Sequence, residues 1–243
     1  AATAPERATA DVSGVASIFR AIFRLSVPVL ATALAVPTIY LVDSMVTIPL
    51  LRGDLGFQAA KDTLGILGGR AQSIAGLPVI FAIAVSQSIL PIISGAYARG
   101  DDAEVSRQTS LALRMTLYTG LPIVVLLCSI VFPLNVLVFG DADGSWIIVA
   151  LVLSVVFQLL MMTSGSILLG LGQASAPMKH IAVGVAVKVA GSFALAPLFG
   201  IYGIVAATAL CFATTAALNL RALRRIVPFT VFGRRALPFA LTV

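Results

Sequence analysis

Residues 145–171 read SWIIVALVLSVVFQLLMMTSGSILLGL, a run of 27 residues without a single charged side chain. An α-helix needs about 20 apolar residues to cross a bilayer core of roughly 30 Å, so this run is long enough to span a membrane. A helix also satisfies its own backbone hydrogen bonds in lipid, which an irregular segment of the same composition does not. We therefore predict a transmembrane helix here.

Five other runs have the same apolar character. They lie at about 24–51, 72–97, 111–139, 177–199 and 201–220. Of the 243 residues, 59% are hydrophobic and only 11% are charged, against about 25% charged in a soluble domain. The mean hydropathy is +1.06. This composition excludes a soluble globular protein and a disordered chain, and the long runs favour helices over barrel strands. The fold class is therefore all-α, a polytopic bundle of six spans.

The two ends of the chain differ from this membrane region. Residues 1–19 begin AATAPERATADVSG and are expected to form a linker or loop before a six-span lobe at 20–225. Residues 226–243 are expected to form a loop and the start of a further span near Ala236. A start at Ala1 and an end inside RALPFALTV suggest the interior of a longer transporter-like chain.

Basic residues predict the orientation of the spans, because cytoplasmic loops carry an excess of Lys and Arg. One set of loops and ends is basic: Arg7, Arg20, Arg24, Arg99, Arg107, Arg114, Lys179, Arg221, Arg224, Arg225, Arg234 and Arg235. The alternate loops near 141–143 and Gly200 contain no Lys or Arg, and the basic residues of the 52–70 segment are offset by Asp54 and Asp62. The N-terminus, the 98–110 loop and the C-terminus are thus predicted to be cytoplasmic, in a cell membrane.

Several function classes find no support in the residues. There is no HExxH, GxSxG or P-loop motif, so an enzyme is not expected. Cys128, Cys211 and a single histidine offer neither a disulfide framework nor a metal cluster, and we predict no cofactor and no metal. The net charge of +6 is spread over loops and helix ends, which argues against a nucleic-acid partner.

Prolines interrupt the apolar runs at Pro28, Pro37, Pro78, Pro91, Pro122, Pro133 and Pro197. Each removes one helical hydrogen bond and favours a kink. Two interpretations stay open: membrane helices are simply richer in proline, or the kinks are hinges for alternating access. The hinge interpretation is strongest for the first span.

Asp43 is a charged residue in the interior of the first apolar run, and it shares one helical face with Tyr40, Ser44 and Thr47. A charge near the bilayer centre costs at least roughly 2.5–3.5 kcal/mol, so Asp43 must face protein, water or a cation. Lys188 lies in the middle of the 177–199 run, among small residues. It could pair with Asp43 across the bundle or point into a water-filled path. For both, a structural pair and a substrate, proton or cation contact are equally open.

Arg70 and Gln87 are the other candidate substrate contacts. Arg70 precedes the second span on the side predicted to be outer, against the usual charge bias. Its guanidinium suits a diphosphate because it forms bidentate charge-assisted bonds, although an anchor that reaches to lipid headgroups is the alternative. Gln87, between Ser86 and Ser88, could bind substrate, but such groups more often hold helices together.

Three stretches carry a family resemblance. They are PTIYLVDSMVTIPLL at 37–51, GLPVIFAIAVSQSILPIISGAYARGDDAEVSR at 76–107, and SILLGLGQASAPMKHIAVGVAVKVAGSFALAPLFGIYGIVAATAL at 166–210. Together they resemble the polysaccharide-biosynthesis and stage V sporulation protein B branch of the MOP (multidrug/oligosaccharidyl-lipid/polysaccharide) exporter superfamily, close to the MurJ-like lipid II flippases.

This resemblance implies a parent of about fourteen spans in two six-helix lobes, of which this chain is the second. It implies a transporter that flips lipid-linked sugar precursors outward by alternating access. Arg70 matches a cavity arginine of the lipid II flippases, and Asp43 and Lys188 match positions often polar in the sporulation branch. The expected partners are the lipid-linked sugar, membrane lipids, the missing first lobe and possible proteins of cell-wall or glycan synthesis.

Two other functions stay open. A proton- or sodium-coupled multidrug (MATE-like) exporter would use Asp43 as its coupling site. A non-transporting membrane scaffold for glycan assembly would leave Asp43, Arg70 and Lys188 without a role.

Overall fold

A computed structural model describes residues 12–229, and within them the chain is helical, with no strand. The helices are α1 (Val12–Ala33), α2 (Ala35–Leu55), α3 (Phe57–Gly65), a π-helical turn η1 (Ile66–Ala71), α4 (Gln72–Ala98), α5 (Asp102–Phe139), α6 (Ser145–Gly170), α7 (Ser175–Phe199) and α8 (Ile201–Ile226). Within the described residues, six helices are long and apolar enough to cross a membrane. The predicted all-α bundle of six spans is confirmed.

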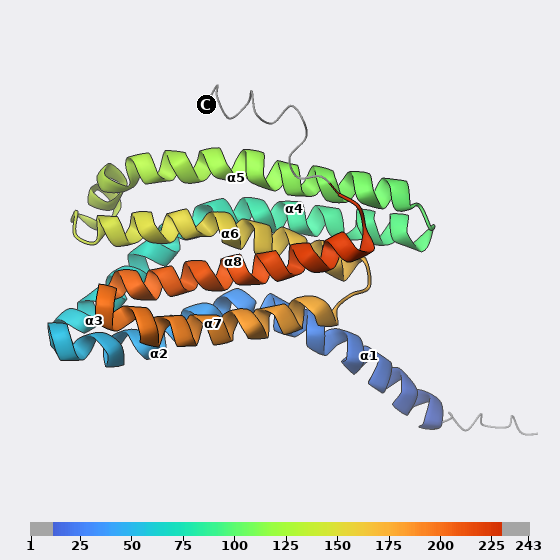
Figure 1. Ribbon diagram of the computed structural model, residues 1–243, viewed down its shortest axis with the longest axis horizontal. Helices are drawn as coiled ribbons and strands as arrows, with labels where there is room; N and C mark the ends of the chain where they lie inside the picture. Colours follow the sequence, from blue (N-terminus) through green and yellow to red (C-terminus); the bar gives the residue numbers. More distant parts are fainter. Residues whose placement is uncertain (1–11, 230–243) are drawn as a thin grey trace, which may run out of the picture.

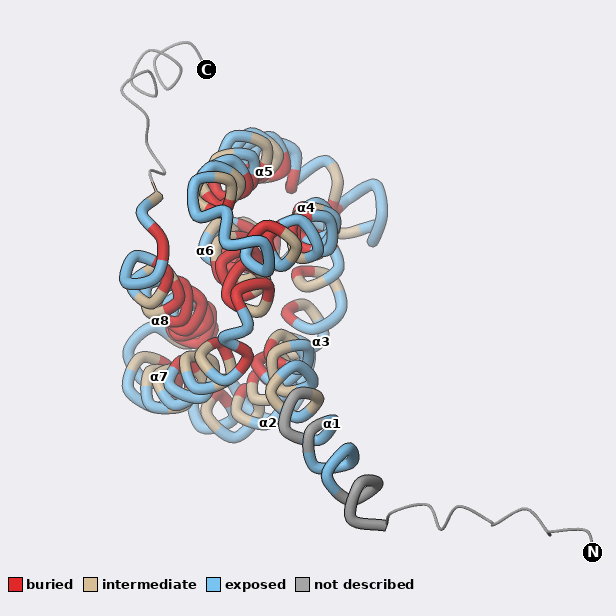
Figure 2. Tube along the Cα trace, turned by 90° about the vertical axis from the view of Figure 1, so that its right-hand side faces the viewer, coloured by how far each residue is buried: buried red, intermediate tan, exposed pale blue. Residues whose placement is uncertain are grey.

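The helices run roughly antiparallel along one long axis (Figure 1). Helices α6 and α8 bury more than half of their most apolar segment, and the other spans bury less than a third. Figure 2 shows the buried residues concentrated in these two helices. A helix that is apolar on all sides belongs in a bundle interior, which explains the position of α6. Helices α4 and α5 cover one side of this centre, and α7 with α2 covers the other.

The ends of the helices fall into two groups. In Figure 1 the start of α1, the α4–α5 turn, the α6–α7 turn and the end of α8 lie at one end of the bundle. The α5–α6 and α7–α8 turns lie at the opposite end. This grouping is the one that the basic residues predict. Which end faces the cytoplasm stays a prediction.

The first span differs from its prediction. The expected linker at 1–19 is helical from Val12, and residues 1–11 lie outside the described part. The apolar run at 24–51 is divided at Leu34, a turn residue between α1 and α2 whose ψ of 0° departs from the regular helix, although the Leu34 N–H still donates to the Leu30 carbonyl and the Thr38 N–H to the Leu34 carbonyl, both at 2.9 Å. Pro37 lies three residues later and has no N–H to donate to the carbonyl of Ala33, which explains the break. The other helical prolines among the described residues lie within helices that continue through them.

Two predicted loops are also helical. The segment before the second span forms α3 and η1, so that α4 continues from them without a loop. In the predicted 98–110 loop, α5 already begins at Asp102, because the Asp101 side chain caps it by accepting a hydrogen bond from the Glu104 N–H at 3.0 Å. The expected further span near Ala236 lies outside the described residues.

Candidate functional site

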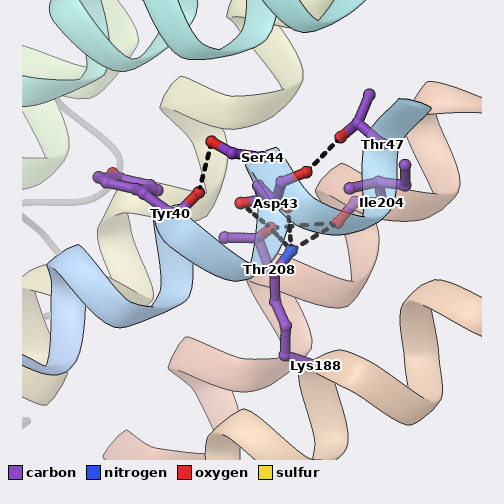
Figure 3. A network of polar contacts seen from close by, with 7 residues as sticks. All are labelled: Tyr40, Asp43, Ser44, Thr47, Lys188, Ile204 and Thr208. Atoms are coloured by element: carbon purple, nitrogen blue, oxygen red, sulfur yellow. Dashed lines mark hydrogen bonds and ion pairs between the residues drawn. The ribbon is translucent and has the colours of Figure 1, made fainter. Parts of the chain in front are cut away.

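Asp43 and Lys188 form an ion pair in the interior of the bundle (Figure 3). Asp43 comes from α2 and Lys188 from α7, and both are almost completely buried, at 1% and 0% exposure. The Lys188 ammonium donates to Asp43 Oδ1, to Thr208 Oγ1 at 2.6 Å and to the Ile204 carbonyl at 3.3 Å. The ammonium thus has three oxygen partners, from α2 and α8, and no contact with solvent.

The rest of the predicted polar face on α2 does not join this pair. Thr47 Oγ1 donates to the Asp43 carbonyl at 2.6 Å, and Ser44 Oγ donates to the Tyr40 carbonyl at 3.1 Å. Both hydroxyls therefore satisfy their own helix backbone, which is common for Ser and Thr inside apolar helices. Thr208 is not recognisable as a partner of Lys188 from the sequence, because one threonine in an apolar run does not indicate a contact.

Small residues bring α7 and α8 close enough to enclose the pair. A Cβ atom added to Gly184 would lie 2.1 Å from Thr215 Oγ1, and one added to Gly191 would lie 3.1 Å from the Ala207 Cβ atom. These glycines lie on either side of Lys188 along α7. Close packing of this kind is typical of membrane helices with small interfacial residues. Lys188 is accordingly fully buried between the helices.

The pairing that the sequence analysis left open is therefore present, and it neutralises two charges that would be costly alone at membrane depth. This geometry favours the structural interpretation of Asp43 and Lys188. A contact of either residue with substrate stays a prediction.

Arg70 lies elsewhere, at the bundle end that carries the α5–α6 turn. It belongs to η1, and its Nη1 atom lies 3.4 Å from both Asp141 Oδ2 and the Asp143 carbonyl oxygen. The guanidinium also lies over the Phe139 ring, 5.5 Å from its centroid. One quarter of the Arg70 side chain is exposed. Arg70 is thus held at this end but remains accessible.

Asp141 provides the negative charge beside Arg70. The Asp143 backbone N–H donates to Asp141 Oδ1 at 2.9 Å. This hydrogen bond, together with the Arg70 guanidinium, favours the ionised carboxyl and lowers the pKa of Asp141 below its ordinary value. The arginine therefore faces a carboxylate at neutral pH. The sequence alone does not indicate this pairing of two residues that lie 71 positions apart.

Gln87 lies in a third place, in the wall of a cavity of about 430 Å³ between the α1–α2 break, α4 and α6. The cavity is mostly apolar, and Gln87 itself is exposed. Ser86 Oγ in the same wall is buried and has no hydrogen-bond partner among the described residues. The four predicted contacts thus fall into three separate places, and only Asp43 and Lys188 meet.

Metal ligands do not gather in the part of the chain that is described: no group of three or more His, Cys, Asp or Glu side chains lies close enough to hold an ion. Cys128 and Cys211 are both free.

Comparison with known proteins gives two matches. The family model described as "Lipid II flippase MurJ" matches residues 69–239. The "Uncharacterized membrane protein YabM" of Bacillus subtilis (strain 168) is 31% identical over 200 residues, which cover 82% of this chain and 37% of that protein. The chain thus spans little more than a third of the length of this relative. No solved structure matches. Because the family model covers well over half of the chain, including Arg70 and Lys188, the chain belongs to the lipid II flippase MurJ family.

Proposed function

We propose that this chain is the second lobe of a flippase that moves a polyprenyl-diphosphate-linked sugar from the inner to the outer leaflet by alternating access. The observation that carries the proposal is the family match over residues 69–239, which includes a partly exposed arginine at one end of a six-span bundle. The precursor of a polysaccharide or of peptidoglycan would be the substrate class.

The physical difficulty of this transport step is the charged diphosphate headgroup of the lipid. A diphosphate cannot cross hydrocarbon unpaired, because burial of an uncompensated charge is very costly. In our proposal Arg70 binds the diphosphate through its guanidinium fork, while the prenyl chain stays in the bilayer. Arg70 suits this role because its exposed fraction leaves N–H groups available and its only carboxylate neighbour among the described residues, Asp141, is itself on a loop.

The membrane potential would supply the driving force. An anion that moves outward across an inside-negative membrane releases about 2.3 kcal/mol per charge per 100 mV. A diphosphate therefore needs no nucleotide hydrolysis for net export. In this proposal the interruption between α1 and α2 at Leu34 would be a hinge for alternating access.

The experiment is a leaflet-transfer assay. The full-length protein is reconstituted in liposomes that contain a fluorescent polyprenyl-diphosphate sugar, with and without a membrane potential, and transfer between leaflets is followed. We expect transfer by the unmodified protein and a loss of at least about tenfold for Arg70→Ala, which corresponds to the roughly 1.4 kcal/mol or more of a charge-assisted bond.

Arg52→Ala is the matched control. Arg52 is an exposed arginine near the end of α2, toward the same end of the bundle, and no contact of its side chain enters the proposal. Its replacement should leave transfer unchanged. No transfer above empty liposomes by a folded protein would overturn the flippase proposal and favour the drug exporter or the scaffold. Equal losses of transfer in both variants would show that Arg70 does not bind the diphosphate specifically.

A drug exporter coupled through Asp43 has less support. Such a site needs a carboxylate that water or a cation can reach, whereas Asp43 is buried and already paired with Lys188.

A further inference from the structure

The ion pair between Arg70 and Asp141 is loose. A single guanidinium nitrogen, Nη1, lies 3.4 Å from Asp141 Oδ2. Charge-assisted bonds between a guanidinium and a carboxylate usually have heavy-atom distances of about 2.7–2.9 Å, and the strong ones use two nitrogen atoms. Both side chains are also partly exposed, at 25% for Arg70 and 44% for Asp141. Exposed pairs contribute little to stability, so this one can open and close at low cost.

The α5–α6 turn keeps its shape when the pair opens. The Asn135 side-chain amide donates to the Asp143 carbonyl at 3.0 Å, and the Asp143 N–H donates to Asp141 Oδ1 at 2.9 Å. Neither hydrogen bond involves Arg70. Of the two oxygen atoms that the guanidinium contacts, the Asp143 carbonyl therefore keeps a donor, and only Asp141 Oδ2 needs water as its new partner. Asp141 thus stays in place for a guanidinium that leaves and returns.

The surface beside Arg70 has room for a headgroup. Arg70 lies in η1, where the Gln72 N–H donates to the carbonyl of Leu67, five residues earlier, and so widens the helix locally. Such π-helical turns are rare and occur frequently at functional sites. A Cβ atom added to Gly68 or Gly69 would meet no atom within 4 Å outside the backbone of its own helix. The turn before Arg70 therefore carries no side chain that would keep a diphosphate away from the guanidinium.

We propose that Asp141 is an internal competitor for the substrate. Its carboxylate occupies Arg70 while the site is empty, gives way to the diphosphate of the lipid, and pairs with Arg70 again as the lipid leaves. This role rests on the proposed function, since it requires that Arg70 binds a diphosphate. Carboxylate and phosphate oxygens accept hydrogen bonds from the same N–H groups, so only one of the two anions can occupy them fully. Pairing with Asp141 lowers the apparent affinity for the diphosphate in proportion to the fraction of molecules in which Arg70 is occupied.

A competitor at this position favours release of the lipid. Tight binding of the diphosphate would give it a long residence time and slow its departure. The α5–α6 turn is predicted to lie on the outer side, where the lipid leaves. The pKa of Asp141 is below its ordinary value because the Asp143 N–H and the Arg70 guanidinium favour the charged form. At neutral pH the carboxylate therefore carries the charge that it needs to replace the departing anion.

Binding of inorganic diphosphate tests the proposal. Isothermal titration calorimetry measures it on the full-length protein in detergent. Asp141→Asn should tighten binding by about two- to fivefold, the factor that corresponds to the loss of a partly exposed ion pair. Asparagine is a suitable replacement because its side-chain oxygen can still accept from the Asp143 N–H, although its charge is gone. Thermal unfolding of each variant checks that the protein remains folded.

Asp54→Asn is the matched control for the charge. Asp54 is an exposed carboxylate near the end of α2 and is not a partner of Arg70. Its replacement removes the same charge and should leave diphosphate binding unchanged. An equal gain in both variants would attribute the effect to net charge and overturn the proposal. In an Arg70→Ala background, Asp141→Asn should give no gain, and a gain there would contradict the competition for Arg70.

The leaflet-transfer assay separates competition from a purely structural role of Asp141. In Asp141→Asn, the lipid concentration at half-maximal transfer should fall by about two- to fivefold, and the maximal rate should fall with it, because the lipid binds more tightly and leaves more slowly. A lower maximal rate at an unchanged half-maximal concentration would show that Asp141 only shapes the turn. An unchanged maximal rate would show that Asp141 does not take part in release.

The two proposals can fail separately. If Arg70→Ala binds inorganic diphosphate as tightly as the unmodified protein, Arg70 does not bind the diphosphate, and the proposed site fails together with its competitor. If binding depends on Arg70 but is the same in Asp141→Asn, the flippase proposal stands and the role of Asp141 is wrong.

Discussion

The burial of Lys188 depends on the polar groups that surround its ammonium. Its ammonium has exchanged water for one carboxylate, one hydroxyl and one carbonyl oxygen. The loss of hydration costs several kcal/mol per buried ion, and only a close partner with additional hydrogen bonds offsets this cost. Asp43 and Lys188 are therefore tolerated in the bundle because each is the partner of the other. The pair fixes α2 against α7 and α8.

We predict that Lys188→Met and Asp43→Asn each lower the stability of the full-length protein strongly, by about 3–5 kcal/mol, because each leaves one buried charge without its partner. The double variant should lose much less than the sum of the two single losses, since no charge is then left alone. Thermal unfolding in detergent, analysed as a double-mutant cycle, measures this coupling.

The exposed pair of Glu104 and Arg107 is the control for this cycle. Its atoms lie 2.7 Å apart, but the pair is in contact with solvent, so its loss should cause little change. If the Asp43 and Lys188 losses simply add, the two residues do not interact and the arrangement in Figure 3 is incorrect.

At the scale of the elements, α7 and α8 form a tight helical hairpin. The two helices are joined at Gly200 alone, which has a positive φ of 57° that favours glycine. Just beyond it, Gly203 lies against the backbone of α7: an added Cβ would lie 2.3 Å from the Leu195 carbonyl oxygen and 2.8 Å from the Ala196 nitrogen. Backbone atoms cannot rotate away as a side chain can.

Gly203→Ala should therefore destabilise the protein by about 1–3 kcal/mol, the usual cost of overpacking. Gly76→Ala is the matched change in α4, where an added Cβ meets nothing within 4 Å. There the substitution should be neutral or stabilise by roughly 0.4–1 kcal/mol, because alanine restricts the unfolded chain. Unfolding midpoints of the two variants provide the comparison, and equal values would contradict the close approach of α7 and α8.

For the whole molecule, the distribution of basic residues makes a prediction about sidedness. The α4–α5 turn should face the cytoplasm and the α5–α6 turn, with Asp141 beside Arg70, should face outward. Ala103→Cys and Ala142→Cys place a thiol at an exposed position near each turn. In intact cells, a membrane-impermeant maleimide should label position 142 and leave position 103 unlabelled until the membrane is opened.

Cys128 and Cys211 are replaced by Ala for this experiment, and the protein without added cysteines gives the background. The reverse labelling pattern would show that the lobe has the opposite orientation in the membrane. It would also place Arg70 on the cytoplasmic side, where it would meet substrate before export rather than after it.

The sequence by itself determined the fold class, the number of spans and the family. These follow from hydropathy and residue order along the chain, because each apolar residue favours lipid whatever its neighbours are. The sequence also placed Asp43 and Lys188 at membrane depth and offered their pairing as one of two alternatives. It did not indicate Thr208 as a partner of Lys188 or Asp141 as a partner of Arg70. It did favour a kink in the first span, through Pro28 and Pro37, without placing it at Leu34.

Only the tertiary structure decided those contacts. Asp43 and Lys188 are 145 residues apart, and Arg70 and Asp141 are 71 apart. Whether such residues meet depends on how the helices rotate and pack against each other. Helices α7 and α8 pack closely because they have glycines at their contact, and the role of these glycines can be recognised only when the neighbouring helix is known. The physical reason is that transfer into lipid is a property of each residue alone, whereas an ion pair is a property of the distance between two of them.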